Sequence, residues 1–387
     1  MGKKKTIAIF SAQYLPHMGG VEFFTREIAE RLVGAGYGVA VITSEQAGSP
    51  EREFVRCGGD GGEGFEVYRL PSIALLGGRF PFPRFGSHRT ALLNELERIS
   101  FDGVIVNTRF YPHSITGVKF GSRLHVPTVV LDHGSDYVTF GVRVLDPIIR
   151  IYERLVTTLL KRRSPDFYGI SGASVEWLES LGVSPKGVIS NALDANAFRS
   201  LSSGRSFKEE LSVPDGSLVV AYVGRFVPEK GILEIVGAAE LLKKKNVPVR
   251  FVLAGEGPLE SECRKAPDNV FIVGRLSQAD VSALLSESDV FVFPSRSEGF
   301  GMSLLEAAAY GNALVGTSAG IAPDLVSAGA GLALSAPNAH EVADRIAELE
   351  DDRERVRLMG ECAMAAADDL FTWDRTIRAL ECALGEG

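Results

Sequence analysis

Short apolar segments alternate with longer amphipathic segments along the whole chain. In the first half, apolar runs of strand length lie at residues 6–10, 39–43, 66–70, 104–107, 128–132, 167–170 and 188–190. The segments between them repeat apolar residues at helical spacing. Strands that alternate with helices form parallel sheets, because the crossover helices cover both faces. The pattern therefore predicts an α/β fold built on parallel sheets.

The alternation lapses at residues 191–205, where Ala, Asn, Ser and Gly predominate and we expect a hinge. Apolar runs then resume at 217–223, 249–254, 270–273, 290–293, 313–316 and 332–334. A chain of 387 residues also exceeds what one core usually serves. We predict two domains, 1–193 and 194–370, with a final helix at 371–387 that packs back on the first.

Composition and charge narrow the class of protein. The chain is 45% hydrophobic and 23% charged, which is ordinary for a globular protein, and its net charge of −8 argues against a nucleic-acid partner. The four cysteines have no metal-ligand spacing, so we expect a reducing compartment and no structural metal. No apolar run approaches the roughly 18 residues of a membrane span. We therefore expect a cytoplasmic protein.

The most informative segment, residues 298–306, follows the apolar run at 290–293. Gly299 and Gly301 let the backbone approach a ligand closely, and the N–H groups of the helix that follows form an anion site. Glu298 in the loop and Glu306 in the helix place a carboxylate on each side of that site. Carboxylates suit the hydroxyls of a sugar or a ribose. An anion beside a polyol indicates a sugar nucleotide.

Two cations follow the strand at 217–223, in the segment 224–231. Arg225 offers a planar fork of donors and Lys230 a mobile point charge, so together they are suited to a diphosphate. In a parallel sheet the loops that follow successive strands lie along one edge, so this loop is expected near Glu298. In the first domain, the pair Gly19-Gly20 and the residue His133 also follow strands.

With these residues assembled, the chain resembles the GT-B-fold retaining glycosyltransferases of family 4, the group 1 type, over nearly its whole length. The family's two glutamates flanking seven residues fall on Glu298 and Glu306. Its Arg and Lys fall on Arg225 and Lys230. Its Gly-Gly loop and its His-Gly fall on residues 19–20 and 133–134. The resemblance implies two Rossmann-like parallel-sheet domains that face each other across a cleft.

The resemblance also implies roles for these residues. Arg225 and Lys230 would hold the donor diphosphate, Glu306 the ribose, and Glu298 and His133 the sugar. The loop 274–276 would take the base, expected to be uracil. The implied catalytic residues are Glu298, Lys230, Arg225 and His133. The implied donor-binding residues are Gly19, Gly20, Arg225, Lys230, Gly274, Arg275, Leu276, Glu298, Gly299, Phe300, Gly301, Met302, Ser303 and Glu306.

The expected reaction moves a sugar from a UDP-sugar to an acceptor hydroxyl, in polysaccharide or glycolipid synthesis. No Asp-x-Asp occurs in the chain, so we expect no metal and no cofactor beyond the nucleotide-sugar co-substrate. Two alternatives stay open: a nucleotide-sugar epimerase, and a non-catalytic partner subunit of the same fold. A dehydrogenase is disfavoured, because Gly-x-Gly-x-x-Gly is absent after the first strand.

One further segment, residues 77–86, alternates phenylalanine and arginine with two prolines. The prolines predict a stiff, extended loop. One interpretation places its three phenylalanines under the first domain. The other places Arg79 and Arg84 on the phosphates of a lipid-linked acceptor, so that the protein visits the cytosolic face of a membrane. Residues 161–163, two arginines after a lysine, would extend the basic surface.

Overall fold

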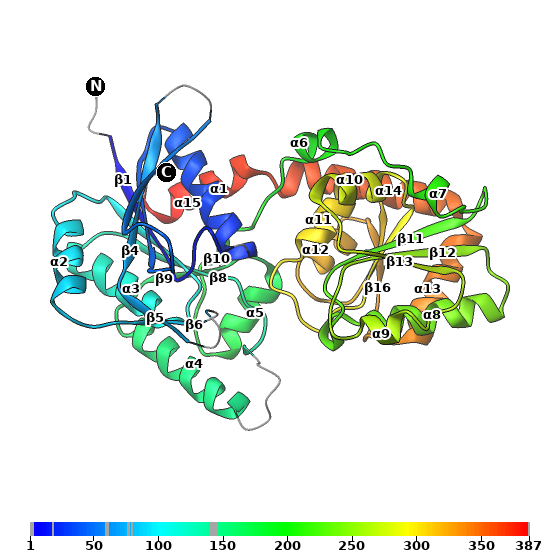
Figure 1. Ribbon diagram of the computed structural model, residues 1–387, viewed down its shortest axis with the longest axis horizontal. Helices are drawn as coiled ribbons and strands as arrows, with labels where there is room; N and C mark the ends of the chain where they lie inside the picture. Colours follow the sequence, from blue (N-terminus) through cyan, green and yellow to red (C-terminus); the bar gives the residue numbers. More distant parts are fainter. Residues whose placement is uncertain are drawn as a thin grey trace. The chain divides into compact units, whose positions relative to one another are not determined.

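The computed structural model describes residues 4–17, 19–58, 62–75, 78, 80–138 and 145–385. The chain divides into two compact units, each an α/β structure (Figure 1). Unit 1 comprises Met1–Ile170, Ser174–Ile189 and Asp374–Gly387, and unit 2 comprises Ser171–Ala173 and Ser190–Trp373. The main crossing lies near residue 190 and the return near residue 374. The sequence placed these crossings after residues 193 and 370.

Unit 1 is built on an eight-stranded sheet with the order β10-β9-β8-β7-β1-β2-β4-β3. Its elements are β1 (Thr6–Ser11), α1 (Gly20–Gly34), β2 (Gly38–Ser44), β3 (Arg52–Arg56), β4 (Gly64–Leu70), β5 (Ser72–Leu75), β6 (Phe80–Pro83), α2 (Ser87–Leu96), β7 (Gly103–Asn107), α3 (Pro112–Leu124), β8 (Thr128–Asp132), α4 (Leu145–Lys161), β9 (Asp166–Gly169), α5 (Gly172–Ser180), β10 (Gly187–Val188) and the C-terminal α15 (Trp373–Ala383).

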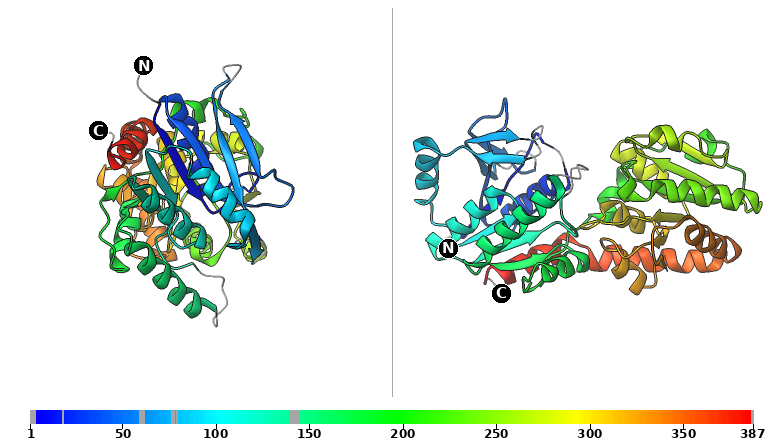
Figure 2. Two further views of the ribbon diagram at one scale, coloured as in Figure 1. Left: turned by 90° about the vertical axis from the view of Figure 1, so that its left-hand side faces the viewer. Right: turned by 90° about the horizontal axis from the view of Figure 1, so that it is seen from below.

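The central strand β1 shows why this sheet carries helices on both faces (Figures 1 and 2). Ile7 and Ile9 point to one face and Ala8 and Phe10 to the other, yet all four are fully buried. Helix α1 packs beside β1 and β2, and α3 packs over β1 and β7. A strand buried on both faces needs an uninterrupted apolar run, which is the pattern the sequence showed.

The edge of the unit 1 sheet departs from the expected all-parallel arrangement. Strand β3 pairs antiparallel with β4, and its side chains alternate between exposed and half-buried. The sequence analysis missed this strand, because β3 lies at the edge and its charged residues gave no apolar run to detect.

The segment expected to be a stiff loop is part of a β-hairpin. Strand β6 pairs antiparallel with β5 to form a separate two-stranded sheet. Phe80 packs against the rings of Tyr111 and Tyr152, whereas Phe82 is 39% exposed and Phe85 is 77% exposed. The interpretation in which all three phenylalanines are covered is therefore wrong for two of them. Arg79 lies outside the described residues.

Unit 2 is built on a six-stranded parallel sheet with the order β13-β12-β11-β14-β15-β16. Its elements are α6 (Ala195–Ser200), α7 (Phe207–Glu210), β11 (Leu218–Val223), the short 3-10 turn η2 (Pro228–Lys230), α8 (Ile232–Lys244), β12 (Val249–Ala254), α9 (Glu260–Cys263), β13 (Val270–Gly274), α10 (Gln278–Ser286), β14 (Val290–Phe293), α11 (Met302–Ala309), β15 (Ala313–Gly316), α12 (Ala322–Ser327), β16 (Gly331–Ala333), α13 (Ala339–Asp351) and α14 (Arg353–Leu370).

The order of this sheet reverses beside β11. The chain passes from β11 outward to β12 and β13, then returns to the other side of β11 with β14. In open parallel sheets a ligand lies beyond the carboxyl ends of the strands at such a reversal, because the two outgoing loops diverge there. A ligand site is therefore expected at the loops that follow β11 and β14.

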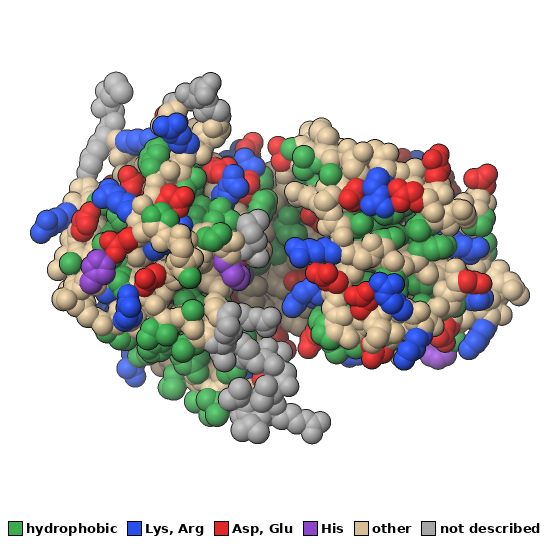
Figure 3. Space-filling view, in the orientation of Figure 1, with side chains coloured by type: hydrophobic (Ala, Val, Ile, Leu, Met, Phe, Trp, Pro, Cys, Tyr) green, Lys and Arg blue, Asp and Glu red, His purple; other side chains and the backbone are tan. Residues whose placement is uncertain are grey.

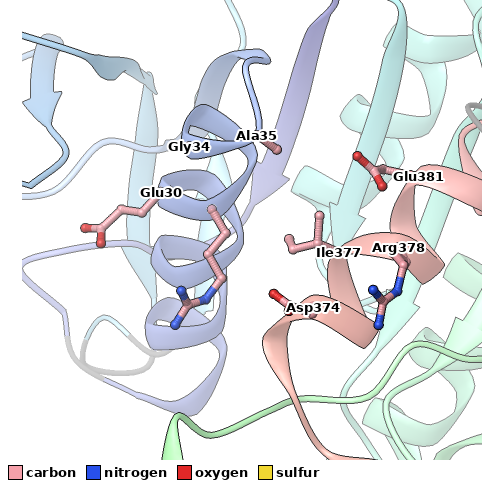
Figure 4. Close-up of a pocket in the computed structure, with 8 residues that line it drawn as sticks. Glu30, Gly34, Ala35, Asp374, Ile377, Arg378 and Glu381 are labelled. Atoms are coloured by element: carbon pink, nitrogen blue, oxygen red, sulfur yellow. The ribbon is translucent and has the colours of Figure 1, made fainter. Parts of the chain in front are cut away.

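The C-terminal helix α15 belongs to unit 1 together with α1. Tyr37 donates a hydrogen bond of 3.1 Å from its hydroxyl to the carboxylate of Glu381, which links the end of α1 to α15. A surface hollow of about 490 Å³ lies between the two helices, with Glu30, Asp374, Arg378 and Glu381 around it (Figure 4). Its lining is mostly charged and open to solvent, and it follows the line along which α15 packs beside α1.

Candidate active site

Two loops of unit 2 meet at the reversal of the sheet. The first carries Arg225 and Lys230 after β11, and the second carries Glu298 after β14. Their backbones are joined, because the N–H of Arg296 donates to the carbonyl of Glu229 at 2.8 Å. The sequence placed both loops at one sheet edge, and the structure brings them into direct contact.

Lys230 and Glu298 form an ion pair between these loops. The side chain of Lys230 is 16% exposed and that of Glu298 is 27% exposed. The ammonium nitrogen of Lys230 also lies 3.5 Å from the carbonyl oxygen of Ser297. Both side chains are mostly removed from water. Separating the pair would therefore cost free energy unless a ligand took the place of the lost partner.

Gly231 allows the two loops to approach so closely. It has a φ of +68°, and a Cβ at this position would lie 2.2 Å from the carbonyl oxygen of Pro294. Such a distance is impossible for a side-chain carbon, so any other residue would push the loops apart. Gly231 also precedes α8, whose first buried residue is Ile232. The glycine therefore fixes Lys230 at the end of its turn.

Helix α11 begins directly after Gly301, which has a φ of +88°. No side chain in the described part of the chain caps this helix start. The first backbone N–H groups, at Met302 and Ser303, face the end without helical partners, as they do in every α-helix. The helix start beside the Lys230–Glu298 pair thus adds a partial positive charge where the sequence predicted an anion site.

Glu306 lies a turn and a half along α11 and, unlike Glu298, has no cationic partner among the described residues. Its side chain is half-buried, and its carboxylate has no ion pair or hydrogen bond with any described residue. Burial raises the pKa of Glu306 to about 7. A carboxylate kept from water without a donor is unfavourable, so the group is suited to accept hydrogen bonds from a ligand.

Arg225 borders a cavity of about 510 Å³ beside these loops. Arg275 and Leu276 line it from the loop after β13, together with Glu256 from the loop after β12. Arg275 and Glu256 lie 3.5 Å apart in an exposed ion pair. The cavity has the size of a small-molecule site. The structure thus brings Arg225 together with the loop that the sequence linked to the base.

The predicted residues of unit 1 also follow strands. Gly19 precedes α1, and its carbonyl accepts a hydrogen bond of 3.0 Å from the N–H of Phe23, while Gly20 is exposed. His133 follows β8, and its ring contacts that of Phe24 edge-on at 5.1 Å. Since Phe24 lies one turn into α1, the glycine pair and His133 occupy the same edge of the unit 1 sheet.

His133 is held as a neutral side chain. Burial lowers its pKa to about 3. Its Nε2 atom is buried and has no hydrogen-bond partner among the described residues. A buried imidazole nitrogen without a hydrogen-bond partner is costly to the fold.

A buried ionic network behind His133 was missed by the sequence analysis. Arg109 forms an ion pair at 3.0 Å with Asp132 and another at 2.9 Å with Glu153, and all three side chains are at most 1% exposed. The second oxygen of Glu153 accepts a hydrogen bond of 2.8 Å from the N–H of Val138. The network therefore fixes both ends of the segment 133–138. The sequence did not indicate that Arg109 is buried, because an arginine in the loop after a strand is usually exposed.

Among the described residues, no group of three or more His, Cys, Asp or Glu side chains is placed to hold a metal ion. In the same part of the chain, no helix is both long enough and apolar enough to cross a membrane.

Two doubly wound α/β units, each with ligand-type loops at the carboxyl ends of its strands, define the GT-B class of fold. The sequence matches "Glycosyltransferase Family 4" over residues 18–197 and "Glycosyl transferases group 1" over residues 204–365. These matches together span most of both units. The chain belongs to the group 1 glycosyltransferases, and it is an enzyme of that type.

Relatives of known sequence or structure agree with this assignment. An uncharacterized glycosyltransferase of Methanocaldococcus jannaschii is 22% identical over 390 residues, with 97% of each chain covered. A GDP-mannose-dependent alpha-(1-6)-phosphatidylinositol monomannoside mannosyltransferase of Mycobacterium tuberculosis is 25% identical, with 95% of each chain covered. The structure of HepE of Anabaena in complex with UDP is similar in fold, with a TM-score of 0.71, 18% identity and both chains fully covered.

Proposed function

We propose that this enzyme transfers a sugar from a UDP-sugar to an acceptor hydroxyl, with retention of configuration at the anomeric carbon and without a metal ion. The single observation that carries the proposal is the Lys230–Glu298 ion pair at the reversal of the unit 2 sheet, beside the start of α11. It places a cation for phosphate next to a carboxylate for sugar hydroxyls. Arg225 stands on the same loop as Lys230.

The ion pair also suggests how the donor is received. A diphosphate competes with Glu298 for Lys230, because both are anions and the ammonium is largely screened from water. When Lys230 turns to the phosphate, the carboxylate of Glu298 becomes available to the hydroxyls of the sugar. The two groups are thus held close to their working positions before the donor arrives.

In the proposed reaction, the bond between the anomeric carbon and the phosphate oxygen breaks, and its electron pair stays on the phosphate. Arg225, Lys230 and the start of α11 stabilise the negative charge that develops there. The acceptor oxygen bonds to the anomeric carbon on the face that the phosphate leaves. The acceptor proton passes to the departing phosphate, so no protein base is required. The products are the glycoside and UDP.

The remaining residues are assigned to binding. Glu306 accepts hydrogen bonds from the ribose hydroxyls, because its carboxylate lacks a partner in the described structure. Gly274, Arg275 and Leu276 hold the base beside the cavity of about 510 Å³. His133 donates to or accepts from a sugar hydroxyl as a neutral ring. The Gly19-Gly20 turn before α1 contributes backbone N–H groups.

The base of the donor is assigned from the loop at residues 274–276. HepE was solved with UDP, whereas the mycobacterial relative is named for GDP-mannose. The assignment to UDP rests on the loop at Arg275, whose fork can bond a carbonyl of uracil. The acceptor is proposed to be a lipid-linked hydroxyl, as the name of the mycobacterial relative indicates for that protein.

The test is calorimetric binding of UDP, GDP and ADP to the purified protein, followed by donor hydrolysis or transfer in excess chelator. We expect UDP to bind most tightly and turnover to persist without metal. Tighter binding of GDP would overturn the base assignment and leave the transferase proposal intact. Loss of turnover in chelator, restored by magnesium or manganese, would overturn metal independence. Release of an epimerised nucleotide sugar would instead support the epimerase alternative.

A further inference from the structure

Helix α4 exposes a stripe of apolar side chains on the surface of unit 1. Ile148, Ile151, Leu155 and Leu159 are 59%, 62%, 59% and 45% exposed. Residues three and four apart lie on one side of a helix, so these four form a continuous row. The opposite side of α4 carries the buried Val156 and Leu160. The helix is therefore apolar toward the core and apolar again toward the outside.

The exposed row is not a chance scatter of single side chains. One exposed leucine on a surface is ordinary, but a contiguous apolar row needs a cover. Figure 3 shows hydrophobic side chains gathered along α4 on the viewer's face of unit 1. The protein leaves this row uncovered in the part of the chain that the structure describes.

The β5–β6 hairpin continues the apolar surface. Phe80 of β6 packs against Tyr152 of α4 with ring centroids 5.7 Å apart, so the hairpin and the helix are neighbours. The hairpin exposes Ile73, Leu75 and Phe82 at 49%, 43% and 39%. Two separate elements thus present apolar side chains next to each other.

Cations border the apolar row. Arg150, Arg154 and Lys161 lie on the flank of α4 beside the row, and Arg162 and Arg163 follow the helix; all five are exposed. None of them forms an ion pair with a described residue. The second acid of α4, Glu153, is buried and bound to Arg109. This is a basic surface on a chain whose net charge is −8.

The hairpin side adds a hollow with an excess of cations. The ring centroids of Phe85 and Phe82 lie 6.4 Å apart, and Phe85 borders a pocket of about 220 Å³. Arg89, Lys119 and Arg123 line this pocket together with Glu97, which pairs with Arg123 at 3.0 Å. Arg89 is 4% exposed and has no carboxylate partner among the described residues. A buried guanidinium without a counter-ion favours an anion nearby.

We propose that α4 and the β5–β6 hairpin form the surface by which this enzyme lies on a membrane rich in anionic lipid. The apolar row enters the boundary between headgroups and acyl chains, and the flanking arginines contact the phosphates. A 17-residue helix is about 26 Å long, which suits a helix lying in the plane of the membrane. The inference rests on the proposed lipid-linked acceptor for its purpose, and on the exposed row and its charges for its evidence.

The test is flotation of the full chain with vesicles of phosphatidylcholine alone or mixed with phosphatidylglycerol. We expect the wild type to float with the anionic vesicles, less at high salt, and hardly with the neutral ones. The double variant Ile151→Glu/Leu155→Glu should lose at least roughly tenfold in partitioning. The matched control is Leu233→Glu/Leu358→Glu, which changes the charge equally at exposed leucines of unit 2 and should float like the wild type.

Three results would overturn the inference. The first is a wild type that does not float with anionic vesicles. The second is that both double variants float as the wild type does. The third is a wild-type dimer in light scattering that binds no vesicles and becomes monomeric only in the α4 variant, which would show that a second copy covers the row. Circular dichroism confirms that the variants fold, since exposed substitutions change stability little. Binding of UDP, GDP and ADP is measured on the same samples. Vesicle binding without binding of any of these nucleotides would refute the proposed function and leave this surface standing.

Discussion

The ammonium of Lys230 and the carboxylate of Glu298 are paired across two loops that follow different strands of unit 2. Each neutralises the other while both remain mostly shielded from water. In the proposed function, an incoming diphosphate breaks this pair. Single substitutions of the two residues should then have opposite effects on nucleotide binding.

We expect Glu298→Gln to bind UDP about two- to tenfold more tightly than the wild type, because it removes a carboxylate that competes for Lys230 and repels phosphate. Its turnover should nevertheless fall at least roughly a hundredfold, because the sugar loses a charged acceptor. Lys230→Ala should weaken UDP binding and reduce turnover further. Calorimetry and steady-state kinetics measure both quantities.

The matched control is Asp268→Asn, which removes the carboxylate of the exposed Lys243–Asp268 pair in the same unit. Exposed pairs contribute little, so its turnover should stay close to that of the wild type. If Glu298→Gln weakened UDP binding as much as Lys230→Ala does, the competition between Glu298 and phosphate would be ruled out.

Glu306 should make the stability of the fold depend on pH. Burial raises its pKa from 4.5 to about 7 in the folded protein. Between these values the unfolded chain has released the proton and the folded chain has kept it, so stability falls as pH rises and levels off above about 7. At pH 8, Glu306→Gln should therefore raise the free energy of unfolding by on the order of 2 kcal/mol, and with it the melting temperature. At pH 4.5 it should change neither quantity much.

The same variant should weaken UDP binding, because Gln accepts hydrogen bonds from ribose hydroxyls less strongly than a carboxylate. Stability and affinity would thus move in opposite directions, which distinguishes a ligand-binding carboxylate from a structural one. Glu240→Gln, at an exposed position of α8, is the control and should alter neither. A loss of stability at pH 8 in Glu306→Gln would show that the carboxylate has a partner in the protein.

His133 should act without titrating in the working range of pH. Burial lowers its pKa from 6.5 to about 3, so the ring is neutral at pH 5 to 9. We expect His133→Gln to keep more turnover than His133→Ala, with pH profiles of the same shape as the wild type, because Gln can still exchange hydrogen bonds with a hydroxyl. An inflection near pH 6.5 that vanished in both variants would contradict the neutral role.

The same pKa has a consequence for stability. Since the unfolded histidine takes up a proton below pH 6.5 and the folded one does so only near 3, His133 stabilises the fold above pH 6.5 and loses that contribution as pH falls. His113, fully buried with a pKa lowered to about 3 by burial, acts in the same direction. Thermal melts of His133→Gln should therefore be less sensitive to acid than those of the wild type.

The central strands were predictable because burial on both faces leaves a continuous apolar run. The run at residues 104–107 lies within β7, and the run at 6–10 lies within β1. The motif residues were predictable for a different reason: glycines, cations and carboxylates that follow strands fall at one sheet edge. Lys230 and Glu298 meet there through topology alone, without any signal in the spacing between them.

The edge elements and the buried charges were not predictable in this way. Strand β3 and the β5–β6 hairpin lie at edges or outside the main sheet, so half of their residues stay polar or exposed. Arg109 is buried only because α4 and β8 close over it with two carboxylates. A single sequence does not record which distant acids will surround an arginine, whereas strand order follows from local patterns.

The guanidinium of Arg109 joins Asp132 at the end of β8 to Glu153 in α4, and it lies 5.4 Å from the centre of the Trp177 ring. Burial raises the pKa of both carboxyl groups, and Arg109 opposes that rise. Arg109→Met should cost about 3–5 kcal/mol of unfolding free energy at pH 8, because it leaves two carboxylates buried without a cation.

Arg52 provides the matched control, because it also pairs with two carboxylates, Glu66 and Glu95, and lies 4.9 Å from the centre of an aromatic ring, but is 53% exposed. Arg52→Met should change stability by less than about 1 kcal/mol. The cost of Arg109→Met should shrink toward pH 5, since protonation then removes the unpaired charges.

Glu153→Gln keeps the shape of the network and tests its link to the segment that carries His133. Its carboxylate oxygen accepts from the N–H of Val138 at 2.8 Å. We expect turnover to fall several-fold while UDP binding stays unchanged, because the donor nucleotide is assigned to unit 2.

Urea unfolding at pH 5 and pH 8 measures stability, and kinetics at saturating UDP-sugar measures turnover. If Arg109→Met and Arg52→Met lowered the free energy of unfolding equally at pH 8, the buried network would stabilise the fold no more than an exposed one.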